Sequence, residues 1–204
     1  MPPISLLIKP ASSNCNLRCK YCFYHSLAEN RETRSYGIMD IDTLEILVKK
    51  TLEYADVTCT FAFQGGEPTL AGFEFFEKLI EFQEKYNTKG VKINNALQTN
   101  GMVIDDRWAK FLHDNNFLVG LSLDGTKDIH DMNRIDAATK GTFNRIMKTV
   151  DLFNKYKVEY NILFVVSSTV ARHTAKIYNF FKRKNFRYLQ FIPCLDPLDE
   201  EPGG

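Results

Sequence analysis

The chain has 204 residues, which is enough for one domain with a substantial core. Its 26 basic and 25 acidic side chains leave a formal net charge of +1, so the charge balance indicates no nucleic-acid partner. No apolar stretch approaches the length of a membrane span, so we expect no membrane partner. The first ten residues lack the basic start and long apolar run of a signal peptide, and we expect a cytoplasmic protein.

Six short apolar runs rich in β-branched residues are typical of strands. They span residues 4–8, 58–63, 91–97, 117–123, 160–166 and 188–192. Between them lie five segments whose apolar residues recur with helical period. These stripes are Leu44, Leu47, Val48 and Leu52; Phe73, Phe76, Leu79 and Ile80; Trp108, Phe111 and Leu112; Phe143, Ile146, Val150 and Phe153; and Ile177, Phe180 and Phe181. A capping box at 42–45 is predicted to begin the first helix, and Asp105 to cap the third.

Strands that alternate with helices predict an α/β fold with a mostly parallel sheet. The continuous apolar runs predict strands that are buried on both faces. No helical pattern follows the sixth strand before the chain reaches its final residue, Gly204. We therefore expect a truncated or partial chain.

Polar and glycine-rich residues follow almost every predicted strand. A cysteine-rich loop follows the first strand, and 64–68 (Gln-Gly-Gly-Glu-Pro) and 98–101 (Gln-Thr-Asn-Gly) follow the next two. Ser122 lies at the end of the fourth strand, and Leu195 follows the sixth. Because ligands gather beyond the carboxyl ends of parallel strands, these residues predict a single pocket at one end of the sheet.

The cysteine-rich loop carries Cys15, Cys19 and Cys22 in a C-x3-C-x2-C arrangement. Three thiolates are one ligand short of a closed tetrahedral site, which favours a site built for chemistry. A [4Fe–4S] cluster with one free iron is one interpretation. A zinc site that recruits His25 and a loop of unligated thiols are the alternatives. The five cysteines are odd in number, which favours reduced thiols over a disulfide framework.

The triad follows the first strand and has Tyr21 before its last cysteine, and it resembles the signature of the radical S-adenosylmethionine (SAM) superfamily. Residues 65–68, Gly-Gly-Glu-Pro, resemble the GGE motif of that superfamily. More of the chain resembles the anaerobic sulfatase-maturating enzymes within it, over essentially all 204 residues. The matching segments are 8–10, 22–25, 63–68, 98–101, 122–125, 130–134 and 189–192.

The resemblance implies a partial (β/α)6 TIM-like barrel that is truncated after strand six. The core domain would span residues 1–196, and 197–204 would begin a linker to a C-terminal domain with auxiliary clusters, which is missing here. The implied cofactors are a [4Fe–4S] cluster and S-adenosylmethionine. The implied reaction oxidises a cysteine or serine of a sulfatase polypeptide to Cα-formylglycine. An electron donor such as ferredoxin or flavodoxin would be a second partner, and the aspartate base is expected beyond residue 204.

The resemblance also assigns residues. Cys15, Cys19 and Cys22 would hold the cluster. The expected S-adenosylmethionine contacts are Tyr21, Gly66, Ser122, Arg134 and Leu195, and the expected substrate contacts are Tyr24 and Gln64. Glycine at position 66 would let the backbone approach the cofactor, although a plain strand-to-helix turn also explains it.

Three further interpretations stay open. Glu67 would assist the cofactor with its charge, whereas Asp124 and Gly125 fit ordinary turn chemistry better than a site role. The chain could instead belong to another radical peptide-modifying maturase that shares the strand motifs. A non-catalytic zinc-binding module using the three cysteines and His25 is the third possibility.

Overall fold

A computed structural model describes residues 3–195, so the predicted linker at 197–204 lies outside the described residues. Its six strands form one parallel sheet in chain order. They are β1 (Ile4–Ile8), β2 (Thr58–Phe63), β3 (Lys92–Thr99), β4 (Phe117–Ser122), β5 (Glu159–Val166) and β6 (Leu189–Pro193). All six predicted strands are present, with ends shifted by no more than two residues.

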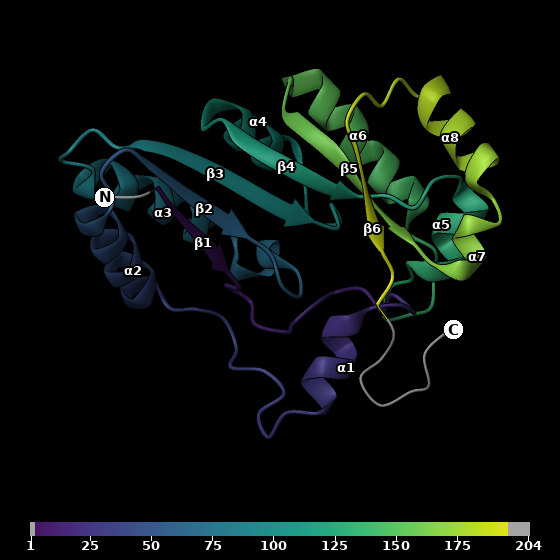
Figure 1. Ribbon diagram of the computed structural model, residues 1–204, viewed down its shortest axis with the longest axis horizontal. Coiled ribbons are helices and arrows are strands. Elements are labelled where there is room, and N and C mark those ends of the chain that lie inside the picture. The colour runs from purple at the N-terminus through teal and green to yellow at the C-terminus, as the bar shows by residue number, and fades with distance from the viewer. Residues whose placement is uncertain (1–2, 196–204) are drawn as a thin grey trace.

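The sheet curls into a partial barrel with its larger helices on the outer side (Figure 1). These helices are α2 (Ile41–Tyr54), α3 (Phe73–Tyr86), α4 (Asp106–Asp114), α6 (Phe143–Tyr156) and α8 (Thr174–Arg183). Each coincides with one of the predicted helical stripes, so the α/β half-barrel is confirmed. No helix within residues 3–195 is long and apolar enough to cross a membrane.

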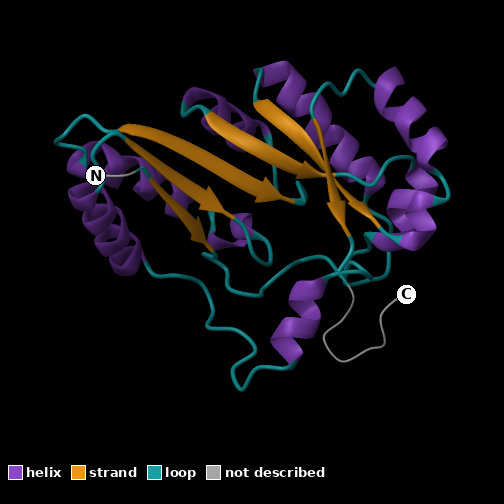
Figure 2. Cartoon of the chain, viewed as in Figure 1, coloured by secondary structure: helices purple, strands orange, loops and turns teal. Residues whose placement is uncertain are grey.

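Four short helices were not predicted. They are α1 (Phe23–Glu29), the 3-10 helix η1 (Pro68–Ala71), α5 (Lys127–Asn133) and α7 (Ser168–Ala171). Each follows a strand within the connection that leads to the next long helix. Figure 2 shows the strand arrows all directed toward the end of the sheet where α1 lies.

The core lies between the outer face of the sheet and the surrounding helices. In β2, Cys59, Phe61 and Phe63 are buried, while the residues between them are only half-buried. On the inner face, Leu7 is 60% exposed and Leu118 is 54% exposed. The prediction that the strands are buried on both faces is therefore wrong for much of the sheet, because six strands do not close the barrel around its inner face. The middle of β4 (119–121) and of β5 (162–164) is nevertheless buried on both faces.

Two of the long helices, α2 and α4, begin at acidic caps. The α2 helix is capped by Asp40, whose Oδ1 accepts a 2.6 Å hydrogen bond from the backbone N–H of Thr43. The predicted capping box at 42–45 is thus placed two residues too late. Asp105 caps α4 as predicted, accepting a 2.9 Å hydrogen bond from the backbone N–H of Trp108.

Candidate functional site

A cavity of about 180 Å³ lies at the carboxyl end of the sheet. Every residue that the sequence predicts for the site lines this cavity: Cys15, Cys19, Tyr21, Cys22, Tyr24, Gln64, Gly66, Ser122, Arg134 and Leu195. They come from the ends of different strands, from α1, from the C-terminal end of α5 and from the cysteine loop, which we define as residues 9–22 between β1 and α1. The structure therefore brings together residues that are up to 180 positions apart in the chain.

The cysteine loop is held in place by backbone hydrogen bonds on both sides. On one side, the N–H of Gly66 donates to the carbonyl of Ser12 at 3.1 Å, and the N–H of Glu67 donates to that of Asn14 at 2.7 Å. On the other side, the N–H groups of Arg18 and Lys20 donate to carbonyls at the end of α5, at 2.7 and 3.0 Å. Backbone groups on two neighbouring connections thus hold the loop in its shape.

Gly66 is required by this packing. A Cβ at position 66 would lie 2.0 Å from the carbonyl oxygen of Asn14, a distance that no real Cβ contact allows. The space that a side chain would fill is occupied by the backbone of the cysteine loop. Close approach of a cofactor is therefore not needed to explain this glycine, although Gly66 also lines the cavity.

Glu67 is 1% exposed and acts inside the protein. Its Oε1 accepts from the backbone N–H of Thr69 at 3.1 Å and from the hydroxyls of Thr69 and Thr99, both at 2.7 Å. Its Oε2 accepts from the backbone N–H of Asn100 at 2.7 Å. Burial raises the pKa of Glu67, and these hydrogen bonds oppose that rise. Glu67 therefore has a structural role that the sequence did not predict, because it ties the end of β2 to the end of β3, and it also lines the cavity.

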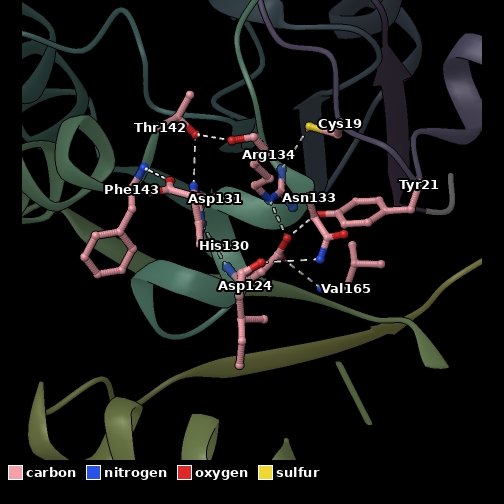
Figure 3. Close-up of polar contacts among 11 residues, drawn as sticks. Cys19, Tyr21, Asp124, His130, Asp131, Asn133, Arg134, Thr142, Phe143 and Val165 are labelled. Atoms are coloured by element: carbon pink, nitrogen blue, oxygen red, sulfur yellow. Dashed lines mark hydrogen bonds and ion pairs between the residues drawn. The ribbon is translucent and has the colours of Figure 1, made fainter. Parts of the chain in front are cut away.

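The fully buried carboxylate of Asp124 is the centre of a second network, which Figure 3 shows. Its Oδ2 accepts from the hydroxyl of Tyr21 and, at 3.0 Å, from Nε of Arg134. Its Oδ1 accepts from the backbone N–H of Val165 at 3.4 Å. Asp124 thus joins the cysteine loop, the end of α5 and β5, so the turn interpretation misses its main role.

Arg134 links this network to the triad. Its Nη1 donates to Sγ of Cys19 at 3.9 Å. Burial raises the pKa of Cys19 to about 11, and the nearby positive charge of Arg134 opposes that rise. Burial alone would lower the pKa of Arg134, but the charge of Asp124 raises it above its ordinary value. The guanidinium group is therefore a permanent cation beside a cysteine of the triad.

His130 makes a further set of hydrogen bonds that hold the Asp124 and Arg134 backbone. The backbone N–H of Asp124 donates to Nδ1 of His130 at 3.3 Å, and Nε2 of His130 lies 3.0 Å from the hydroxyl of Thr142. That hydroxyl donates to the carbonyl of Arg134 at 3.0 Å. Burial, together with the nearby charge of Arg134, lowers the pKa of His130 to about 4. The imidazole is therefore neutral near pH 7.

The geometry does not assemble a zinc site of the Cys3His type. His25 is exposed, with Nδ1 3.2 Å from Glu29 and its Nε2 3.4 Å from Arg34. Across residues 3–195, no three His, Cys, Asp or Glu side chains gather closely enough to hold one metal ion. A [4Fe–4S] cluster is larger than one ion and spaces its ligand sulfurs more widely. Three soft thiols at the edge of a cavity therefore fit a cluster.

Comparison with known protein families shows the family to which the chain belongs. The model of the radical SAM superfamily matches residues 10–180. The chain belongs to the radical SAM superfamily. Members of this superfamily use a [4Fe–4S] cluster and S-adenosylmethionine, so the predicted cofactors are confirmed at the level of the family.

Within the radical SAM superfamily, the chain is similar to curated sulfatase-maturating enzymes. It is 62% identical over 203 residues to a cysteine-type anaerobic sulfatase-maturating enzyme of Clostridium perfringens, covering 100% of this chain and 55% of the relative. It is 35% identical to a serine-type anaerobic sulfatase-maturating enzyme of Klebsiella aerogenes, covering 95% of this chain and 47% of the relative. The chain thus spans about half the length of the curated relatives it matches.

Solved structures of radical SAM proteins show the same similarity. Native anSMEcpe with bound AdoMet and Cp18Cys peptide superposes with a TM-score of 0.94 at 60% identity, covering 99% of this chain and 54% of that one. Streptococcus suis SuiB bound to S-adenosylmethionine gives a TM-score of 0.70 at 19% identity, covering 97% of this chain and 42% of that one. The second likeness shows the shared fold alone.

Proposed function

We propose that this chain is the radical-forming core of a cysteine-type anaerobic sulfatase-maturating enzyme. Its reaction would oxidise a cysteine of a sulfatase polypeptide to Cα-formylglycine. The observation that carries this proposal is the single cavity lined by every predicted cluster, cofactor and substrate residue. Identity of 62% to a cysteine-type enzyme, against 35% to a serine-type enzyme, supports cysteine as the target.

In this proposal each wall of the cavity has a task. Cys15, Cys19 and Cys22 hold the cluster as thiolates, and Gly66 meets the amino group of S-adenosylmethionine through its carbonyl. Arg134 has its Nε committed to Asp124 and its Nη1 in contact with Cys19, which leaves Nη2 for the carboxylate of the cofactor. Ser122, at the end of β4, offers a hydroxyl that both donates and accepts.

Four more residues complete the cofactor and substrate walls. The hydroxyl of Tyr21 is bound to Asp124, so Tyr21 offers its backbone to the adenine, and Leu195 lines the adenine edge. Nε2 of Gln64 donates to the hydroxyl of Tyr24 at 3.2 Å. Both side chains line the same cavity, where they would position the target residue of the peptide.

When bound, the two cofactors supply a carbon radical that removes a hydrogen atom from the β-carbon of the target cysteine. Loss of one proton, and of one further electron to the auxiliary clusters expected in the further length of the relatives, completes the two-electron oxidation. Hydrolysis of the resulting thioaldehyde releases hydrogen sulfide. This chain excludes water and holds the reactants, while a ferredoxin or flavodoxin supplies the first electron. We place the aspartate base in the further length that the relatives possess, and the whole enzyme in the cytoplasm.

Anaerobic reconstitution with iron and sulfide tests the cluster and its role. We expect the wild-type chain to turn brown and to cleave S-adenosylmethionine, and Cys19→Ala to lose both properties. Cys59→Ala is the matched control, because Cys59 is a buried residue of β2 that does not line the cavity. A colourless protein with one zinc per chain, or full activity of Cys19→Ala, would overturn the proposal.

Mass spectrometry of a sulfatase peptide containing Cys-x-Pro-x-Arg tests the substrate. Formylglycine is the expected product. An internal thioether crosslink would instead assign the chain to another class of radical peptide maturase. Cleavage of S-adenosylmethionine without any change in the peptide would refute oxidation by these 204 residues alone and would leave radical formation as their function.

A further inference from the structure

Asn100 is a buried polar residue that touches the triad. It directly follows β3 and is 6% exposed. Its Nδ2 donates to Sγ of Cys15 at 3.7 Å and to Oδ1 of Asn16 at 2.8 Å. The side-chain amide therefore faces one particular sulfur of the triad.

The orientation of this amide is fixed by its other partners. Its Oδ1 accepts from the backbone N–H of Met102 at 3.0 Å, a group that can only donate, so the amide cannot be flipped without losing that bond. The backbone N–H of Asn100 donates to Glu67, which is held by three further donors from Thr69 and Thr99. A rigid set of hydrogen bonds thus aims the Asn100 amide at the cysteine loop.

The three sulfurs are not equivalent. Cys15 Sγ accepts a second hydrogen bond, at 3.4 Å, from the backbone N–H of Leu17. Cys19 Sγ has the Arg134 guanidinium at 3.9 Å. Hydrogen bonds to ligand sulfurs stabilise negative charge there, and reduction of a cluster adds one negative charge. Donors to sulfur therefore favour the reduced state and raise the reduction potential.

We propose that Asn100 tunes the reduction potential of the [4Fe–4S] cluster through its hydrogen bond to Cys15. Asn100 is a positioning residue: it acts on the cluster through a ligand and does not touch the substrate. The inference rests on the proposed function, since it requires a cluster on the triad. Its consequence is that the cluster accepts its single electron from a donor more readily than the three thiolates alone would allow.

Asn100→Leu removes the amide with little change in size, and Asn95→Leu is the matched control. Asn95 lies in β3, the strand that Asn100 follows, and is 8% exposed, but its side chain pairs with Gln83 of α3 at 2.9 and 3.0 Å. Both variants and the wild type would be reconstituted and titrated with dithionite and redox mediators, with EPR of the one-electron-reduced cluster as the signal. We expect a more negative midpoint potential for Asn100→Leu and the wild-type value for Asn95→Leu.

Asn100→Ala serves as a second variant in case leucine is too bulky at this position. Equal midpoint potentials in all the loaded proteins would overturn the inference and leave the proposed function standing. Failure of both Asn100 variants to load a cluster, where Asn95→Leu loads one, would show that Asn100 builds the loop and would also overturn it. Failure of the wild type to load a cluster would instead refute the proposed function.

Discussion

The glycine at position 66 has two possible explanations, one from a cofactor and one from packing inside the protein. The sequence links it to a cofactor, whereas the structure shows the Asn14 carbonyl in the space of a Cβ. Both explanations predict that a side chain at position 66 is unfavourable. The first predicts weaker cofactor binding, and the second predicts a displaced cysteine loop. Steric conflict with the cysteine loop displaces the loop itself, with or without a cofactor.

Gly66→Ala therefore tests the packing. Overpacking of this kind costs about 1–3 kcal/mol. We expect a loss of thermal stability in the cofactor-free protein, together with a lower iron content after reconstitution. Gly90→Ala is the control, because a Cβ at Gly90 meets no atom within 4 Å and its positive φ adds backbone strain only. Unchanged melting of the cofactor-free Gly66→Ala protein would contradict the packing explanation.

His130 gives the protein a dependence of stability on pH. Its pKa falls from 6.5 to about 4 on folding, so the unfolded chain binds a proton in this range that the native state excludes. Stability from His130 is thus fully present above pH ~6.5 and is lost as pH falls toward ~4, by up to about 3 kcal/mol. Urea unfolding across this range should show a shallower pH dependence in His130→Gln than in the wild type. The exposed His173→Gln is the control, and equal slopes for all three proteins would refute the assignment.

At the scale of elements, the strands could be predicted because each is a β-branched apolar run bounded by polar or glycine-rich residues. The long helices could be predicted because each has a stripe on one face. The short helices could not: α1 and α5 have 7 residues each and α7 has 4, which is too few for a repeated stripe. Asp124 and Asn100 were missed because their partners are distant; Asp124 and Tyr21 are 103 positions apart.

Glu67 controls the junction between β2 and β3. Glu67→Gln replaces one carboxylate oxygen with an N–H group that must face another donor. Because all the partners are donors and the site is buried, we expect the free energy of unfolding to fall by about 1.5–3 kcal/mol. Denaturant unfolding of this variant beside Glu74→Gln, an exposed residue in the first turn of α3, measures the difference. Equal losses in the two variants would show that the junction does not depend on the Glu67 network.

At the scale of the molecule, the cavity could be predicted because parallel strands deliver their carboxyl ends to one edge. Its interior organisation could not, because burial and long-range hydrogen bonds decide it. Ser122 and Arg134 were placed in the cavity by resemblance, and the Asp124 carboxylate that holds Arg134 is a feature of the folded chain alone. The open inner face likewise follows from a curvature that strand composition does not reveal.

The fold should not depend on the cluster. The cysteine loop is held by backbone hydrogen bonds from Gly66 and Glu67 and by others to the end of α5, and the core lies between the outer face of the sheet and the helices. We expect the Cys15→Ser, Cys19→Ser, Cys22→Ser triple variant to keep the far-UV circular dichroism of the wild type. It should unfold cooperatively, at a temperature below that of the cluster-loaded protein. Loss of the cooperative transition would show that the cluster is needed for folding.

The backbone hydrogen bonds that hold the cysteine loop have a consequence for the stability of the protein when it is exposed to oxygen. Oxygen destroys exposed iron–sulfur clusters, and a scaffold that needed iron to fold would then be lost to proteolysis. We expect the cluster site of this protein to persist after the iron has gone, because the backbone partners of the loop lie in the β2–η1 connection and at the end of α5. Damage by oxygen would then be confined to the inorganic part, and the same polypeptide would be refilled when anaerobic conditions return.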